Sequence, residues 1–377
     1  MNRKTLILCL SVLALLVAIV AAGVFMLYSP GSTSKDKAAT VLPKSDYKLF
    51  QAVPSDAAML MTFSKTSEAF SVLNDSTQVF SVLMTDAASA KHPFSNFIKL
   101  CRKADLGELK SENAVVSLHY SGTLEPLMLI AAGNAPADTS DAERRLMALA
   151  DSAKLLHRLV DCSEIAPESS KLRKSQLLLI SSSETLLTAS ERHIEGGMSI
   201  LDKDSFPQAA AEASGHDALF VSHDYASKLF PVYLLKPYTS HSTFFSRFAD
   251  WSVLSIRSNN SKKISMVGSS VTPDKDQTAF ANVYANAHGG DAQFTSVVPA
   301  SAIFAVSVQT SDIKSYEEAY AQYLDAAGKS DRFNSVSKAR RDSLGVTPQQ
   351  WFEKMDVKEV AKADVLVGDD AHIAARD

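Results

Sequence analysis

The order of apolar and polar residues separates one continuous apolar segment from a longer region in which short apolar runs alternate with polar ones. Residues 6–28 carry no charge, and only Ser11 and Gly23 interrupt the hydrophobic residues. At about 1.5 Å per residue, a helix of this length reaches roughly 35 Å, enough to cross a hydrocarbon core of about 30 Å. The pattern predicts a transmembrane helix over 6–28, within an N-terminal anchor at 1–28.

The same segment has a second interpretation, a cleaved signal peptide. Residues 20–22 resemble a small-residue cleavage site. The apolar run is, however, longer than the stretch of about 7 to 15 residues typical of signal peptides. We therefore expect an uncleaved anchor and keep the cleaved signal as the alternative.

The flanking charges predict the orientation of this anchor. Arg3 and Lys4 precede the apolar run, whereas Lys35 and Lys37 on the other side are balanced by Asp36. Positive charge favours the cytoplasmic side of a membrane helix. We expect a cytoplasmic N-terminus, a folded part in the cell envelope or periplasm, and the lipid bilayer as the partner of residues 6–28.

The region after the anchor predicts a mixed fold. Residues 29–45 have the composition of a tether. Apolar runs bounded by turn residues predict strands at 57–63, 114–118, 127–131, 177–180, 218–221, 251–257 and 264–271. Helical spacing and capping residues predict helices at 65–73, 76–85, 93–103, 140–160, from Ser181 to Gly196, and from Thr272 to Gly289. Because these elements lack a βαβ rhythm, we expect an α+β fold with a mainly antiparallel sheet and packed helices.

One segment of the chain is repeated. Residues 53–63 (VPSDAAMLMTF) are echoed by 298–308 (VPASAIFAVSV), 245 residues later. Residues 108–116 resemble 359–367 in the same order. The spacing predicts a complete α+β unit at 46–292 and a partial second copy at 293–377. Asp377 is either a truncation of a longer chain or the end of a half-unit.

The opening of each copy, Val53-Pro54-Ser55-Asp56-Ala57 and Val298-Pro299-Ala300-Ser301-Ala302, together with the anchor at 6–28, resembles a family of uncharacterised exported bacterial proteins. In that family a membrane helix precedes repeated α+β units that begin with Val-Pro-x-x-Ala. The family has no established activity. The resemblance implies architecture and localisation only.

Composition excludes several classes of protein. Hydrophobic residues make up 46% and aromatic residues 8% of the chain, which excludes a disordered or collagenous protein. The net charge is −4, and Arg3 and Lys4 are the only charges before residue 29, so the rest carries −6. A weakly acidic, evenly mixed surface argues against a nucleic-acid partner.

The cysteines leave two interpretations open. Cys101 and Cys162 follow the membrane segment without any Cys-x-x-Cys or zinc-ligand spacing. A disulfide between them would close a loop of about 60 residues and stabilise by a few kcal/mol. Two separate buried thiols are the alternative.

Two His-Asp pairs, His216-Asp217 and His223-Asp224, invite a metal or catalytic interpretation. In a strand, histidines seven residues apart lie about 23 Å from each other on opposite faces. In a helix they lie about 10 Å apart, and one metal about 2 Å from each ligand cannot bind both. We expect these residues to flank a buried strand.

Other candidate groups have structural explanations. We expect residues 274–276 at a charged helix start, Lys171, Arg173 and Lys174 on a solvated strand edge, and Trp351, Phe352 and Met355 in the core behind a capping box at Thr347. The chain has no P-loop, G-x-G-x-x-G, nucleophile elbow, H-E-x-x-H or EF-hand motif.

The sequence therefore predicts a single-pass, anchored extracytoplasmic protein that is not an enzyme. It indicates no catalytic residues, no cofactor site and no metal site, and we expect a structural or interaction role with an unknown protein partner. Two alternatives stay open. One is a carrier or chaperone for an apolar ligand or client, and the other is an envelope hydrolase with an unrecognised site.

Overall fold

The computed structural model describes most of the chain after residue 48. The described ranges are 49–74, 94–132, 141–162, 176–196, 198–203, 205–213, 217–229, 241–259, 264–273, 277–286, 293–299, 302–310, 312–355 and 357–365. The expected anchor at 1–28, the tether at 29–45 and the expected helix at 76–85 lie outside them. Within these ranges no helix is both long enough and apolar enough to cross a membrane.

The described residues fall into two compact units. The first contains residues up to Pro273 and the second begins at Asp274, earlier than the expected boundary at 292. Phe280 explains the difference, because its ring packs 5.2 Å from that of Tyr323, measured between centroids. The segment after Pro273 therefore belongs to the second unit.

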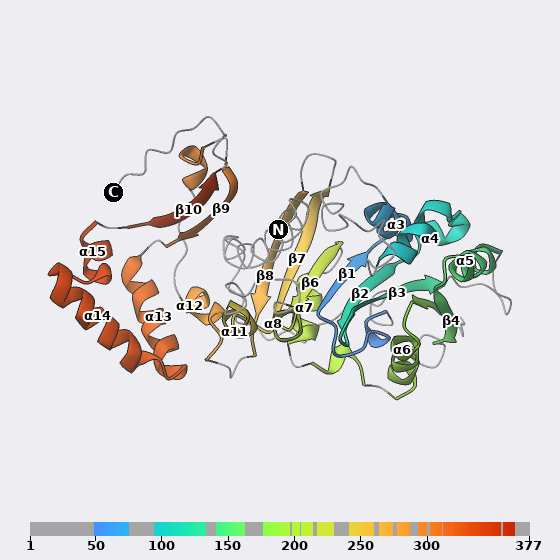
Figure 1. Cartoon of the computed structure of the whole chain (residues 1–377), viewed down its shortest axis with the longest axis horizontal. Helices are drawn as coiled ribbons and strands as arrows, with labels where there is room; N and C mark the ends of the chain where they lie inside the picture. Colours follow the sequence, from blue (N-terminus) through green and yellow to red (C-terminus); the bar gives the residue numbers. More distant parts are fainter. Residues whose placement is uncertain are drawn as a thin grey trace. The chain divides into compact units, whose positions relative to one another are not determined.

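The first unit is built on an antiparallel sheet whose strand order is β4-β5-β3-β2-β1-β6-β7-β8 (Figure 1). Every described strand pair in it is antiparallel, which confirms the expected α+β class. The strands are β1 Met59–Phe63, β2 Ala114–Tyr120, β3 Leu124–Ala132, β4 Leu156–Asp161, β5 Gln176–Ser181, β6 Ala218–Ser222, β7 Trp251–Asn259 and β8 Ile264–Val271.

Helices cover both faces of this sheet. Its helices are α3 Thr66–Asn74, α4 Ser95–Lys103, η2 Gly107–Ser111, α5 Asp141–Ser152, α6 Glu184–Gly196, η4 Ile200–Asp202, α7 Phe206–Glu212, α8 His223–Ser227 and α11 His241–Ser246. Alternate strand residues point to opposite faces. Val115 accordingly joins a core with α6 and α7, whereas Val116 joins a core with α3, α4 and α5.

The expected helix at 140–160 is wrong beyond residue 152. Lys154 has a φ of 61°, a left-handed conformation that ends the helix. Leu156 and Leu159 then lie in β4, paired with β5. Their helical spacing had assigned these leucines to the helix, but in the structure they pair with the edge of the sheet instead.

The capping predictions were partly right. Ser183, not Ser181, accepts a bond from the N–H of Leu186 at the start of α6. Ser181 instead donates its hydroxyl to the carbonyl of Pro126 across the sheet. The box at Thr347 is confirmed, because its hydroxyl accepts from the Gln350 N–H and its own N–H donates to the Gln350 side chain.

Gly268 marks a close approach of β8 to β7. A Cβ placed on it would lie 1.7 Å from the carbonyl oxygen of Val253. No side chain fits there without moving the backbone, so the hairpin requires glycine at this position.

The second unit contains a two-stranded antiparallel sheet and helices (Figure 1). Its elements are α12 Ala281–Asn286, η5 Phe294–Ser296, β9 Ala302–Gln309, α13 Ile313–Ala326, α14 Ser330–Leu344, α15 Pro348–Met355 and β10 Glu359–Val365. Its apolar core is small, and Val283, Ala319, Tyr323 and Leu324 form its buried centre. None of the side chains that the structure describes in β9 or β10 belongs to this core.

The expected core positions of Trp351 and Met355 on α15 are wrong, and the side chain of Phe352 lies outside the described part of the structure. The side chains of Trp351 and Met355 are 57% and 53% exposed, and α14 buries no residue. Both residues follow helical spacing and lie on one face of α15, but no described element covers that face.

Candidate functional site

The most suggestive polar cluster of the first unit is a hydrogen-bonded chain of Ser117, His119 and Asp56. The Oγ of Ser117 lies 2.9 Å from Nε2 of His119, and Nδ1 of His119 lies 2.8 Å from an Asp56 carboxylate oxygen. When Nδ1 donates to Asp56, Nε2 is the acceptor for the serine hydroxyl. This order of contacts is that of a serine hydrolase triad.

Local structure brings these three residues together. Ser117 and His119 are two apart on β2, so they share the face that also carries Val115. Asp56 lies in the turn that opens β1, where the Ala57 N–H donates to the Pro54 carbonyl. Antiparallel pairing of β1 with β2 sets that turn beside His119.

Ser117 is too deeply buried to act as a nucleophile. The side chains of Ser117 and His119 are almost entirely buried, and only Asp56 reaches solvent, with 52% of its side chain exposed. A nucleophilic serine must meet substrate, and Ser117 lies inside the packed face of the sheet. The arrangement is that of a satisfied buried polar network.

The pKa values of Asp56 and the neighbouring His193 are consistent with a structural role for the Ser117–His119–Asp56 network. The hydrogen bond from His119 holds the pKa of Asp56 below its ordinary value. Nearby on α6, burial lowers the pKa of His193, although the carboxylates of Asp56 and Asp202 oppose that shift. Asp56 therefore anchors the network as an anion.

A second buried network centres on His223, at the start of α8. Its Nδ1 lies 3.0 Å from the Phe245 carbonyl, which only accepts, so Nδ1 donates. Its Nε2 then accepts from Ser252 at 2.7 Å, and Ser252 accepts from Ser270 at 2.8 Å. Burial lowers the pKa of His223 to about 4, so the ring is neutral at physiological pH.

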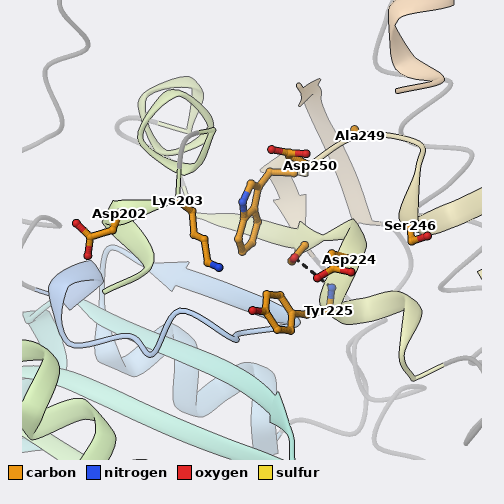
Figure 2. A pocket seen from close by; sticks show the side chains of 9 residues that line it. Asp202, Lys203, Asp224, Tyr225, Ser246, Ala249 and Asp250 are labelled. Atoms are coloured by element: carbon orange, nitrogen blue, oxygen red, sulfur yellow. Dashed lines mark hydrogen bonds between the residues drawn. The ribbon is translucent and has the colours of Figure 1, made fainter. Parts of the chain in front are cut away.

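A polar pocket of about 330 Å³ lies beside this network (Figure 2). Lys203 reaches toward the ring of Tyr225, with Nζ 5.4 Å from its centroid, while Asp202 points away from that ring. The pocket is lined by Asp202, Lys203, Ser222, Asp224, Tyr225, Ser246, Ala249, Asp250 and Trp251.

The carboxylates of this pocket serve the local structure. Asp202 accepts from the Ser199 N–H, Asp250 accepts from the Ser205 hydroxyl, and Asp224 pairs with Lys228. Within the described ranges no group of three or more histidine, cysteine or acidic side chains could hold a metal ion. The pocket is therefore a polar depression of the surface whose carboxylates already have partners within the protein.

Two carboxyl groups meet at the other end of β6. Asp217 accepts from the Ser64 N–H at 2.7 Å. A hydrogen bond with Asp217, reinforced by burial and by the negative charge of Asp217, raises the pKa of Glu68 to about 7. The pair thus shares a proton near neutrality.

The structure separates most residues that the sequence singled out. Asp217 and His223 flank the buried strand β6, as expected, and His216 lies outside the described residues. Cys101 and Cys162 form no disulfide and lie in the cores on opposite faces of the sheet. Burial raises the pKa of the Cys101 thiol to about 12. The basic cluster at 171–174 and the charged segment 274–276 also lie outside the described residues.

The Ser117–His119–Asp56 chain had only a partial signal in the sequence. Serine and histidine two positions apart on a predicted strand share one face. Asp56 lies about 60 residues away, and only the register of β1 against β2 shows that it belongs with them. No family model, curated protein or solved structure matches this chain.

Proposed function

We propose that this chain is a single-pass membrane-anchored protein, with a cytoplasmic N-terminus and an extracytoplasmic α+β part that binds another protein and performs no catalysis. The uncharged segment 6–28 and the pair Arg3-Lys4 support the anchor and its orientation. The Val-Pro-x-x-Ala resemblance to exported bacterial proteins supports the envelope location.

The observation that carries the interaction role is the exposed apolar surface of the second unit. Outside the second unit, the described large hydrophobic side chains that are exposed are few and scattered. Exposed tryptophan and methionine are typical of binding surfaces. The exposed large hydrophobics of the second unit are Val297, Val336, Leu344, Val346, Trp351, Met355, Val360 and Val365.

The second unit resembles the start of the first unit in its opening turn and in the order of its elements. In each unit a Val-Pro turn closes with a bond from an alanine N–H to the proline carbonyl, 3.3 Å at Ala57 and 2.9 Å at Ala302. A strand, helical segments and an antiparallel partner strand follow in the same order. In the second unit β10 is the partner strand in that order.

The register of the strands aligns the second repeated segment differently from the sequence comparison. Phe63 lies opposite Ala114, and its repeat equivalent Val308 lies opposite Val360. Ala114 thus corresponds to Val360, whereas the sequence comparison aligned it with Val365. The shift arises because Glu108 lies in η2, whereas Glu359 begins β10.

The Ser117–His119–Asp56 chain favours one alternative, an envelope hydrolase. A fluorophosphonate probe applied to the full chain tests it, because this reagent labels activated serines. We expect no labelling that depends on Ser117. Labelling that disappears in Ser117→Ala and persists in the control Ser121→Ala, an exposed hairpin position, would establish an enzyme instead.

Extraction of membranes with alkaline carbonate tests the anchor. We expect the full chain to stay in the membrane pellet and a chain that starts at residue 46 to be released. Protease added to the outer side should digest the folded part of the anchored chain. Release of the full chain by carbonate, or protection from the protease, would contradict the proposal.

A further inference from the structure

We propose that a pocket formed by α13, α14 and α15 in the second unit binds a guanidinium group. The proposal goes beyond the interaction role above, because it concerns a site for one charged group, whether that group belongs to an arginine side chain or to a free guanidinium compound. The pocket has a volume of about 270 Å³. Pockets for drug-sized ligands have about 300–1,000 Å³, so this one suits a group of side-chain size.

Helical spacing builds the main wall of this pocket. Glu317, Tyr320 and Leu324 are three and four residues apart, so they share one face of α13. Phe333 of α14 packs against this face, with its ring 5.6 Å from that of Tyr320 between centroids and at an angle of 82°. Gln349, in the first turn of α15, also lines the pocket. Three helices thus bring together two aromatic rings, a carboxylate and an amide.

Two of these side chains have hydrogen-bonding capacity that is not used. The Oε1 atoms of Glu317 and Gln349 are buried and have no hydrogen-bond partner among the described residues. A buried acceptor without a donor is unfavourable. The last torsion of glutamate and glutamine side chains is soft, so each oxygen can turn toward a donor in the pocket. A ligand that donates hydrogen bonds therefore supplies the partner that both side chains lack.

The charges of the pocket select a cation. Glu317 and Asp325 line it, and no lysine, arginine or histidine is among the described residues that do so. Burial and the negative charge of Glu353 raise the pKa of Glu317. A bound cation would stabilise the charged form of Glu317, whereas an anion would be repelled.

The polar pocket of the first unit shows the contrast. There Lys203 lines the pocket together with the carboxylates, so the protein supplies its own cation. In the second unit Asp325 accepts from the Ser330 hydroxyl, but Oε1 of Glu317 has no such donor among the described residues. The pocket of the second unit has the carboxylate and leaves the place of the cation to a ligand.

The aromatic wall favours a guanidinium over an ammonium group. A guanidinium is planar, stacks on aromatic faces and donates several hydrogen bonds in its plane. It can therefore stack on the aromatic wall while it donates to Glu317. The same unit already pairs a cation with a tyrosine, because Nζ of Lys329 lies 4.9 Å from the ring centroid of Tyr323 and donates to its hydroxyl at 2.6 Å.

Saturation-transfer difference NMR of the full chain in phosphatidylcholine nanodiscs tests the proposal, with empty nanodiscs as the blank. The probe is Nα-acetyl-arginine amide, and we expect saturable binding. The citrulline analogue keeps the shape of the probe without its charge and should bind at least fivefold more weakly. The lysine analogue has the charge without the planar group and should bind at least threefold more weakly.

Variants of the protein show where the probe binds. Glu317→Gln removes the charge and keeps the shape, so it should weaken binding of the arginine probe at least fivefold. Glu318→Gln is the matched control, because it removes an exposed neighbouring carboxylate that does not line the pocket, and it should bind within twofold of the parent. Gln349→Glu adds a carboxylate and should tighten binding at least threefold. Circular dichroism establishes that the variants fold, and Gln349→Glu tests the site if Glu317→Gln does not.

Two further probes identify the source of the group. They are ethylguanidinium and a tripeptide with arginine between two glycines, acetylated and amidated at its ends. Tighter binding of the tripeptide supports an arginine side chain of a protein. Equal or tighter binding of ethylguanidinium supports a free guanidinium compound.

Four results would overturn the proposal. They are absence of saturable binding, equal binding of the citrulline analogue, equal binding to the folded Glu317→Gln protein, and a Gln349→Glu protein that binds no tighter than the parent. Equal binding of the lysine analogue would refute the assignment to a guanidinium group.

Discussion

At the residue scale, His223 is the buried group whose charge state most affects the first unit. Its pKa of about 4 lies below the ordinary value of 6.5 because burial disfavours the cation. The unfolded chain therefore takes up a proton at a higher pH than the folded chain. The stability contributed by the neutral ring is present above pH 6.5 and is lost as pH falls toward 4.

We predict that this loss amounts to about 3 kcal/mol, since one pKa unit corresponds to about 1.36 kcal/mol. His223→Gln should be less stable than the parent at pH 7 and should lose about 3 kcal/mol less between pH 7 and pH 4. Urea unfolding at several pH values measures this. Trp351→Phe in both proteins leaves Trp251, buried in the first unit, as the only tryptophan reporter. Equal pH dependence in the two proteins would contradict the prediction.

The carboxyl pair of Glu68 and Asp217 affects the pH dependence of stability with the opposite sign to His223. Because the pKa of Glu68 is raised to about 7, its protonated form is favoured in the folded chain. That stability is present below pH 4.5 and is lost as pH rises through 7. Glu68 is 43% exposed, so solvent screening limits the effect to about 1 kcal/mol or less.

We predict that Glu68→Gln reduces the decline in stability between pH 5 and pH 8, because glutamine donates to Asp217 at every pH. The same tryptophan fluorescence measures it. Asp217→Asn is unsuitable as a control, since Asp217 also accepts from Ser64. Lys65→Gln, which removes the neighbouring cation, should steepen the decline. A Glu68→Gln protein that declines like the parent would refute the shared proton.

At the element scale, the hairpin of β7 and β8 offers the clearest steric prediction. Gly268→Ala would place a methyl group against the Val253 carbonyl, which must move. We expect a loss of about 1–3 kcal/mol or more. The neighbouring Ser269→Ala is the control. It removes a buried hydroxyl with no hydrogen-bond partner among the described residues and should be neutral or stabilising. Chemical denaturation measures both, and equal stability of the two variants would contradict the account.

The elements also show what sequence patterns can and cannot predict. Short apolar runs between turn residues identified β1, β2, β3, β5, β6, β7 and β8, because burial on a sheet face demands such runs. The left-handed Lys154 has no sequence signal, so the leucines after it were assigned to the wrong element. Asp56 and His119 meet only through strand pairing, which local patterns do not specify.

At the scale of the whole molecule, the two units differ in how completely they bury apolar surface. The first has a sheet covered on both faces, whereas the described core of the second is small and helical. The repeat of residues 53–63 at 298–308 stays a prediction from the sequence. The exposure of Trp351 had no sequence signal, because helical periodicity predicts a face and cannot show whether another element covers that face.

The central claim is that the second unit of an anchored chain binds a protein partner. Photo-cross-linking of the full chain, in membranes of the cells from which it comes, tests this most directly, with a benzophenone side chain at Trp351 or at the control Leu156. Leu156 is an exposed apolar residue of the first unit. The account predicts a discrete protein adduct from position 351 and none from position 156. No adduct at 351, or equal adducts at both positions, would contradict it.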